Sequence, residues 1–169
     1  MDLYFEGFKG IADFMKSQKK FAHRNECVYT LVGRKRRLPM INSSNYGDVG
    51  YGERLSINSC IQGSGADIMM NAQNKIEGTS PYYVSRETLD NIYEEGTEPF
   101  IASERLKELG CEMLVQIHDE LLFECVEDNC EEAMQLIRDC MINPFGENVK
   151  LNLPLEVGMA HGLTYACGH

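Results

Sequence analysis

The sequence lacks the features of a membrane-spanning or secreted protein. No run approaches the ~20 consecutive apolar residues that cross a bilayer, although hydrophobic residues make up 43% of the 169-residue chain. The N-terminal segment 1–6 has neither the basic start nor the apolar core of a secretory signal peptide. Internal repeats and low-complexity tracts are also absent. These absences predict an intracellular globular chain with no membrane partner, of a size that suits one domain.

Cysteine is not scarce, but it lacks the spacing of a metal site. The chain has seven cysteines, an odd number, and no C-x-x-C pair. Zinc sites usually contain such pairs, and disulfides are rare in intracellular proteins. We therefore expect scattered reduced thiols.

Positive charge is scarce outside the first quarter of the chain. Residues 1–40 carry nine Lys or Arg and four Asp or Glu, whereas residues 41–169 carry seven and twenty-two, so the local net charges are +5 and −15 and the total is −10. Four basic residues are consecutive: Arg34, Lys35, Arg36 and Arg37. Such a strip can bind phosphate backbones even on an acidic protein, although a solvated surface would use the same residues.

The pattern of apolar and turn-forming residues predicts a mixed chain of helices and short strands. In the first half we expect a helix over 2–24, a strand at 28–32, a short extended segment at 38–41, a loop at 42–52 and a long helix over 53–76. In the second half we expect a loop at 78–100 with a short helix over 86–93, a helix capped by Ser103 and ending at Gly110, a helix capped by Asp128 or Asn129 and ending near Met141, and an edge strand at 151–157.

A polar break interrupts the apolar stretch between these last helices. Runs at 113–117 and 121–123 flank His118, Asp119 and Glu120, which predicts a β-hairpin with these polar residues at its tip. Adjacent carboxylates repel each other, and a divalent cation relieves that repulsion. An ordinary polar turn, in which Asp bonds nearby backbone N–H groups, remains the alternative on residue types alone.

A second polar pattern lies in the predicted helix 53–76. Arg54, Asn58 and Gln62 are spaced four residues apart, which places them on one stripe of a helix. Their side chains can bond base edges, sugars and phosphates. A solvated helix face would show the same pattern.

Three segments together resemble the C-terminal part of family A DNA polymerases. They are Gly33–Ser43 with the basic strip, Glu53–Ile68 with the polar stripe, and Val115–Glu124 with His118-Asp119-Glu120. The segment 1–6 also resembles a point just after that family's fingers helix, and 153–157 resembles the last palm strand. The resemblance therefore covers nearly the whole chain in the right order.

The resemblance implies a role for each matched position. Asp119 would be a catalytic ligand in a two-Mg²⁺ phosphoryl-transfer site, and the neighbouring Glu120, of the same catalytic pair, would support it. Arg54, Asn58, Gln62 and His118 would contact primer and template, largely from the minor-groove side. The strip Arg34, Lys35, Arg36 and Arg37 would hold backbone phosphates.

Parts of the family's catalytic centre have no counterpart in the sequence. The second catalytic Asp, from a segment of the type Asp-Tyr-Ser-Gln-Ile-Glu, is missing, as are the fingers helix, the thumb and the exonuclease acids. Gly158 stands where the family usually has an acid, and the connection 77–105 is longer than usual. We therefore expect either a second polypeptide that carries the missing parts or self-association. The alternatives are a catalytically inactive DNA-binding remnant and a piece of a longer polymerase.

The expected fold class is α+β. The resemblance implies an incomplete polymerase palm over 28–169, with an antiparallel sheet centred on the hairpin and backed by helices, and a helical segment over 1–27 from the fingers side. Because the rest of the palm would ordinarily cover apolar surface, an exposed hydrophobic patch is expected. The expected location is the cytoplasm of a bacterial or phage-infected cell.

Overall fold

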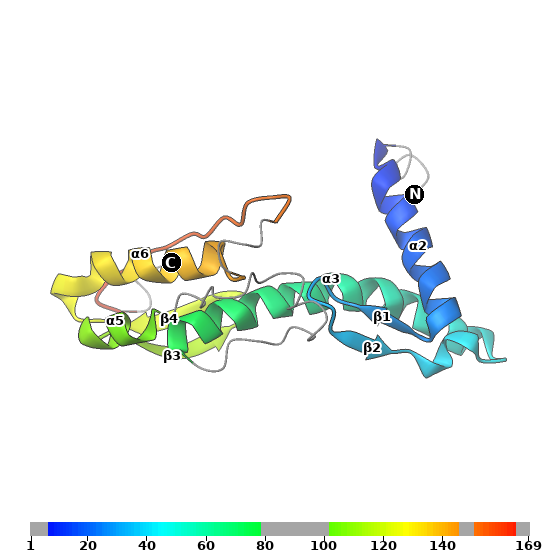
Figure 1. Cartoon of the computed structure of the whole chain (residues 1–169), viewed down its shortest axis with the longest axis horizontal. Helices are drawn as coiled ribbons and strands as arrows, with labels where there is room; N and C mark the ends of the chain where they lie inside the picture. Colours follow the sequence, from blue (N-terminus) through cyan, green and yellow to red (C-terminus); the bar gives the residue numbers. More distant parts are fainter. Residues whose placement is uncertain (1–6, 79–101, 146–150, 165–169) are drawn as a thin grey trace, which may run out of the picture. The chain divides into compact units, whose positions relative to one another are not determined.

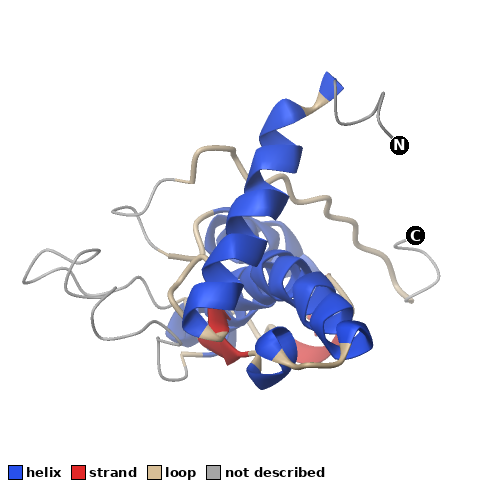
Figure 2. Ribbon diagram, turned by 90° about the vertical axis from the view of Figure 1, so that its right-hand side faces the viewer, coloured by secondary structure: helices blue, strands red, loops and turns tan. Residues whose placement is uncertain are grey.

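The computed structural model describes residues 7–78, 102–145 and 151–164. Helices make up most of the described ribbon, and strands are confined to two antiparallel pairs (Figure 2). The α+β class is therefore confirmed, with two separate two-stranded sheets in place of one sheet. The chain forms two compact units, one ending at Asp67 and the other beginning at Ile68. The predicted division at residue 27 stays a prediction.

The first unit begins with α2 (Lys9–Asn25), which is the helix predicted over 2–24. Glu26 ends it in the left-handed region, with φ 52°, and its N–H bonds the Ala22 carbonyl at 2.8 Å. β1 (Cys27–Tyr29) then pairs antiparallel with β2 (Lys35–Arg37). The predicted strand at 28–32 is shortened because the chain turns from Thr30 onward.

Two predictions in the next segment are wrong. Residues 38–41 do not form an extended segment, because Pro39 begins a 3₁₀ helix, η1 (Pro39–Asn42), and the fixed φ of proline suits a first helical position. The segment 42–52 is only partly a loop, because α3 (Tyr46–Glu77) begins seven residues earlier than predicted. Asn45 accounts for the early start, since its side-chain oxygen accepts a 2.8 Å bond from the Gly47 N–H, as an N-cap does.

The core of the first unit joins all of these elements. Its buried side chains come from α2, β1, η1 and the first half of α3, with Leu38 between β2 and η1: Ala22, Val28, Leu38, Ile41 and Cys60. Gly52 permits the close approach of α3 to η1, because a Cβ there would lie 3.2 Å from the Ile41 Cα. This packing fixes one face of α3 and leaves the opposite face exposed.

The second unit contains the end of α3, α5 (Ser103–Glu108), β3 (Glu112–Ile117), β4 (Glu120–Glu124), η2 (Glu127–Asn129) and α6 (Cys130–Ile142). Its α-helices and strands are labelled in Figure 1. The predicted hairpin is confirmed, and a bulge lies between Met113 and Val115. The core of the second unit is formed by buried residues of its helices and of the base of the hairpin: Ile76, Ala102, Leu106, Leu109, Cys111, Ala133, Ile137 and Cys140.

The two predicted helix caps in this unit are only partly right. Ser103 is the first residue of α5 and not its cap, and α5 ends at Glu108, two residues before Gly110 with φ 65°. Asn129 is the N-cap residue of α6, but its side chain makes no capping bond and donates instead to the Leu109 carbonyl at 3.0 Å.

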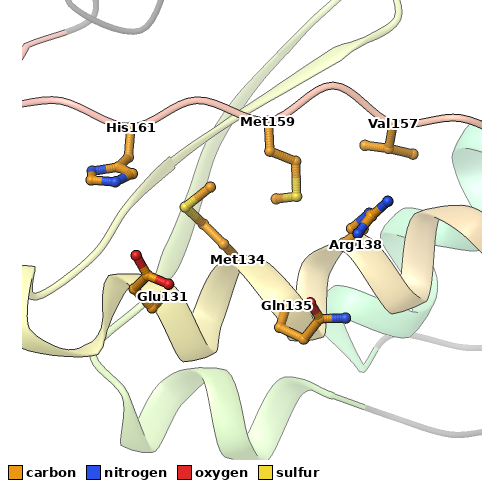
Figure 3. A pocket seen from close by; sticks show the side chains of 7 residues that line it. All are labelled: Glu131, Met134, Gln135, Arg138, Val157, Met159 and His161. Atoms are coloured by element: carbon orange, nitrogen blue, oxygen red, sulfur yellow. The ribbon is translucent and has the colours of Figure 1, made fainter.

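The predicted strand at 151–157 is wrong, since residues 151–164 contain no strand. The predicted alternation does not hold throughout, since Leu153 is 77% exposed, but Val157, Met159 and His161 all point toward α6 (Figure 3). Pro154 has no N–H to donate to a ladder. The predicted helix at 86–93 lies outside the described residues. Among the helices that are described, none has the length and apolarity needed to cross a membrane.

Three apolar side chains are exposed on β3, and the predicted hydrophobic patch stays a prediction. Leu114, Val115 and Ile117 expose 54%, 44% and 39% of their surface. The six cysteines in the described ranges are free thiols, as predicted.

Candidate functional site

The polar stripe lies on the exposed side of α3. Arg54, Asn58 and Gln62 are all exposed, whereas Ser56 and Cys60 face the core. The buried polar groups bond within the helix, since the Ser56 hydroxyl donates to the Glu53 carbonyl at 2.7 Å and the Cys60 thiol lies 3.2 Å from the Ser56 carbonyl. The helix therefore presents three hydrogen-bonding side chains along one line while its other face stays packed.

The β1–β2 turn packs directly on α3. A Cβ at Gly63 would lie 2.7 Å from the Thr30 Cγ2, so only glycine fits there without a shift. The Leu31 N–H donates to the Ser64 hydroxyl at 2.8 Å, which joins the turn to the same helix turn. This contact positions the basic strip.

Arg34 differs from the rest of the strip. Its Nε forms a 2.8 Å ion pair with the Asp67 carboxylate, whose side chain is fully buried, and its Nη2 donates to the Gly63 carbonyl at 3.1 Å. The Arg34 side chain thus anchors the turn to α3. Its predicted phosphate contact stays a prediction.

The other three cations form β2. Lys35, Arg36 and Arg37 are all exposed, and the Lys35 ammonium lies 6.0 Å from the centre of the Tyr29 ring. Their side chains are therefore exposed, and their predicted phosphate contacts stay a prediction.

A polar network that the sequence did not reveal links α2, η1 and α3. In it, both ring nitrogens of His23 face an acceptor, the Asn42 side-chain oxygen at 3.1 Å and the Glu53 carboxylate at 3.2 Å. Lys19 pairs with the same carboxylate at 2.8 Å. The Asn42 contact and then the Glu53 contact raise the pKa of His23, while Lys19 and His23 lower the pKa of Glu53. The sequence pattern does not predict these contacts, because Asn42 and Glu53 are 19 and 30 residues away from His23.

The carboxylate pair lies at the tip of the β3–β4 hairpin. Ile117 pairs with Glu120, which leaves His118 and Asp119 as a two-residue loop. His118 has φ 57°, in the region that glycine favours. All three tip residues, His118, Asp119 and Glu120, are exposed.

Gln116 is a further residue at the tip that the sequence did not single out. Its amide donates to the His118 carbonyl at 2.8 Å and its oxygen accepts from Gln73 of α3 at 3.0 Å. The only sequence signal was a polar residue within an apolar strand. The last turns of α3 therefore brace the loop that carries Asp119.

The positions of the acidic side chains can be compared with the ligands that the predicted Mg²⁺ requires. Among residues 7–78, 102–145 and 151–164, no three His, Cys, Asp or Glu side chains gather in a way that could hold a metal ion. Mg²⁺ binds through one or two carboxylates plus waters and phosphates. Asp119 with Glu120 therefore suits part of such a donor set.

A pocket of about 360 Å³ lies elsewhere in the second unit, between α6 and the segment after Pro154 (Figure 3). None of the predicted site residues lines it. Its lining residues are Glu131, Met134, Gln135, Arg138, Val157, Met159 and His161.

The chain is similar to known polymerases along its whole length. DNA polymerase I A, chloroplastic, of Oryza sativa subsp. japonica is 34% identical over 167 residues, which is 98% of this chain and 13% of that protein. DNA polymerase I of Rhizobium leguminosarum is 36% identical over 154 residues, 91% of this chain and 13% of that protein. The chain thus spans about an eighth of the length of these relatives.

A solved structure supports the same relationship. The POL domain of Pol1 from M. smegmatis, in complex with DNA primer-template and dNTP, superposes with a TM-score of 0.76 at 30% identity and covers 99% of this chain and 25% of that chain. A family model described as DNA polymerase family A matches residues 1–167. On this evidence, the chain belongs to DNA polymerase family A.

Proposed function

We propose that this chain supplies one side of the active centre of a DNA-directed DNA polymerase, together with part of its primer-template surface. The hairpin loop carries the proposal, because it places His118, Asp119 and Glu120 at one exposed tip in a chain that matches the family from residue 1 to 167. Relatives named as DNA polymerases support the assignment.

In this proposal Asp119 is a Mg²⁺ ligand and Glu120 supports it. Carboxylate oxygens are the hard donors that Mg²⁺ prefers. Bound Mg²⁺ would activate the primer hydroxyl as a nucleophile and stabilise the charge on the leaving pyrophosphate. The hairpin holds Asp119 in a two-residue loop, which limits the orientations of its carboxylate.

The exposed stripe of α3 would contact the newest base pairs. Arg54 and the amides of Asn58 and Gln62 donate hydrogen bonds that suit minor-groove acceptors, and these acceptors are nearly the same for every correct pair. His118, in the second unit, is likewise proposed to contact primer-template DNA. Such contacts check the shape of a pair and do not read its sequence.

The β2 cations would hold backbone phosphates. Lys35, Arg36 and Arg37 are exposed, and the counterions that they release from DNA would make binding depend on salt. Arg34 would contribute mainly by holding the turn against α3 through Asp67.

The opposing carboxylate would come from a second polypeptide that also carries the fingers and thumb. One carboxylate pair cannot hold two metal ions in line with a triphosphate, and no cluster of three acids occurs within the described part of the chain. Exposed Leu114, Val115 and Ile117 on β3 give such a partner an apolar surface.

Primer extension tests this proposal. The full chain is mixed with each polypeptide of the same genome that carries the missing aspartate segment, and extension of a labelled primer is measured with Mg²⁺. We expect Asp119→Asn to lower the rate by about a thousandfold, from the several kcal/mol of charge stabilisation at a metal site. Asp128→Asn, an exposed acid in η2, is the matched control and should leave the rate unchanged.

If no partner restores extension, or if Asp119→Asn is as active as the unmodified chain, the catalytic proposal is wrong.

The second candidate is a catalytically inactive DNA-binding remnant. It is favoured by the lack of a three-acid cluster among the described residues, and the exposed cations of β2 would supply its phosphate contacts. In this case the chain alone should bind primer-template DNA with a salt-dependent affinity. Arg36→Ala should reduce the salt slope by about one, and Arg24→Ala, the same charge change on α2, should not. If neither the unmodified chain nor either variant binds primer-template DNA, this candidate is excluded.

A further inference from the structure

Three cysteines gather at the base of the hairpin whose tip carries Asp119. The last paired residues at this end are Glu112 of β3 and Glu124 of β4, so Cys111 and Cys125 occupy the next opposed positions. Cys130 is the first residue of α6, five residues after Cys125. These thiols come from three segments that the fold brings together.

Cys111 and Cys125 belong to the same core. Cys111 is one of its buried residues, Cys125 packs against it, and the register of the hairpin places the two opposite each other. Opposed residues in an antiparallel pair have Cα atoms about 4.5–5.5 Å apart, which falls within the range of about 4.4–6.8 Å that a disulfide requires. Residues that oppose each other next to the last pair of such a ladder therefore suit a disulfide.

The two thiols differ in access. Cys111 is buried, with 4% of its surface exposed, whereas Cys125 is half-buried. Burial, followed by the neighbouring Cys125, raises the pKa of Cys111 to about 12. Cys125 is therefore the thiol that meets an external reagent first, and Cys111 is the one that reacts afterwards within the protein.

We propose that Cys111 and Cys125 form a reversible redox site, in which a small organic disulfide oxidises them to an intramolecular bridge across the base of the hairpin. Neither the bridge nor its test depends on the polymerase function proposed above.

The reaction is a pair of thiol–disulfide exchanges. The Cys125 sulfur, after losing its proton to water, attacks one sulfur of the reagent RSSR, so that a Cys125–SR bond forms and RS⁻ leaves. Cys111 then loses its proton, attacks the Cys125 sulfur and expels the second RS⁻. Both electrons pass to RSSR, which becomes two RSH, and the protein loses two hydrogen atoms.

The bridge would restrain the hairpin. It joins the chain just before β3 to the chain just after β4, so the two strands can no longer separate at their base. Amides in the β3–β4 ladder should therefore exchange with solvent about tenfold more slowly, because local opening is suppressed. The loop with Asp119 would be held on a stiffer support.

Peptide mapping of the full chain tests the bridge. The native protein is treated with oxidised glutathione, its remaining thiols are blocked, and it is cleaved after glutamate. Trypsin is unsuitable, because residues 108–138 contain all three cysteines and no internal Lys or Arg. Cleavage after glutamate places Cys111 in 109–112 and Cys125 in 125–127.

A peptide of 109–112 linked to 125–127, lighter by two hydrogen atoms and separated by reduction, is the expected product. Cys125→Ser should abolish it and the slower amide exchange, whereas Cys130→Ser should leave both unchanged. Because Cys125 is half-buried, its serine variant is expected to fold, which circular dichroism would check.

Two results would overturn the proposal. One is a link between 125–127 and 128–131, which would show that Cys130 is the partner. The other is a stable glutathione adduct on Cys125 with no internal link, which would show that Cys111 cannot reach it in the folded chain.

Discussion

Arg34 is expected to matter for stability in a way that its neighbours in the basic strip do not. Its Nε lies 2.8 Å from the Asp67 carboxylate, which is fully buried, and its Nη2 bonds the Gly63 carbonyl at 3.1 Å. Arg36 is exposed on β2. Arg34→Ala should therefore lower the free energy of unfolding, and Arg36→Ala should leave it within about 0.5 kcal/mol of the unmodified chain.

The magnitude follows from the burial of the two partners. A hydrogen bond to a charged group contributes about 1.5–3 kcal/mol to stability. The loss lies at the upper end of this range when the partner that remains is a buried carboxylate. The Arg34 side chain is 41% exposed, so solvent screens its charge and lowers this contribution. We expect a loss of about 2 kcal/mol.

Urea denaturation of four chains would measure this interaction directly. They are the unmodified chain, Arg34→Ala, Asp67→Asn and the double variant, with Arg36→Ala as the matched control. The losses of the two single variants should not add, and the coupling energy should be about 1–2 kcal/mol, since the residues are in contact. If Arg34→Ala and Arg36→Ala lower the free energy of unfolding equally, Arg34 does not anchor the turn in a way that Arg36 does not.

Three further perturbations test other parts of the structure. Gly65→Ala, with open space around its Cβ, should stabilise α3 by about 1 kcal/mol, whereas Gly63→Ala should destabilise it because its Cβ would meet Thr30 at 2.7 Å; similar melting temperatures would contradict this packing. His118→Gly should stabilise the chain by about 1 kcal/mol, since it removes a side chain at φ 57°, and should weaken primer-template binding; unchanged binding in a fluorescence titration would count against a DNA role. His23→Gln should reduce stability most below pH 6.5, because the pKa of His23 is raised in the folded chain. The stabilisation that protonated His23 contributes is lost as the pH rises through this raised pKa. A loss of less than about 1 kcal/mol that does not change with pH would contradict this.

The hairpin and the polar stripe could be predicted because both are local patterns. Two apolar runs around a polar break fix the register of β3 and β4, and a spacing of four fixes the common face of Arg54, Asn58 and Gln62. Neither inference needs a distant partner. The family resemblance rests on the same segments.

The division of the basic strip could not be predicted in this way. In the sequence Arg34 is one of four consecutive cations, and its partner Asp67 is 33 residues away. Spacing alone gives no reason for the turn to bring them together. The contact between Thr30 and Gly63 does so, and it depends on tertiary packing.

The wrong predictions also arise where local pattern competes with a single specific residue. The loop predicted at 42–52 rested on glycine, serine and asparagine, yet Asn45 caps a helix that packing then sustains through Gly52. The strand predicted at 151–157 rested on alternation, but alternation requires only that one side be covered, and here α6 covers Val157 and Met159.

The hairpin tip shows how the structure sustains a conformation that its residue types disfavour. A non-glycine residue at positive φ costs on the order of 1 kcal/mol and persists only where its surroundings determine it. Here Gln116 bonds the His118 carbonyl, and Gln73 at the end of α3 holds Gln116 in turn. Helix α3 therefore supports the orientation of the loop without contributing an acid to it. A glycine would fit the backbone of this loop better, so His118→Gly separates the backbone cost of the histidine from the DNA contact proposed for its side chain.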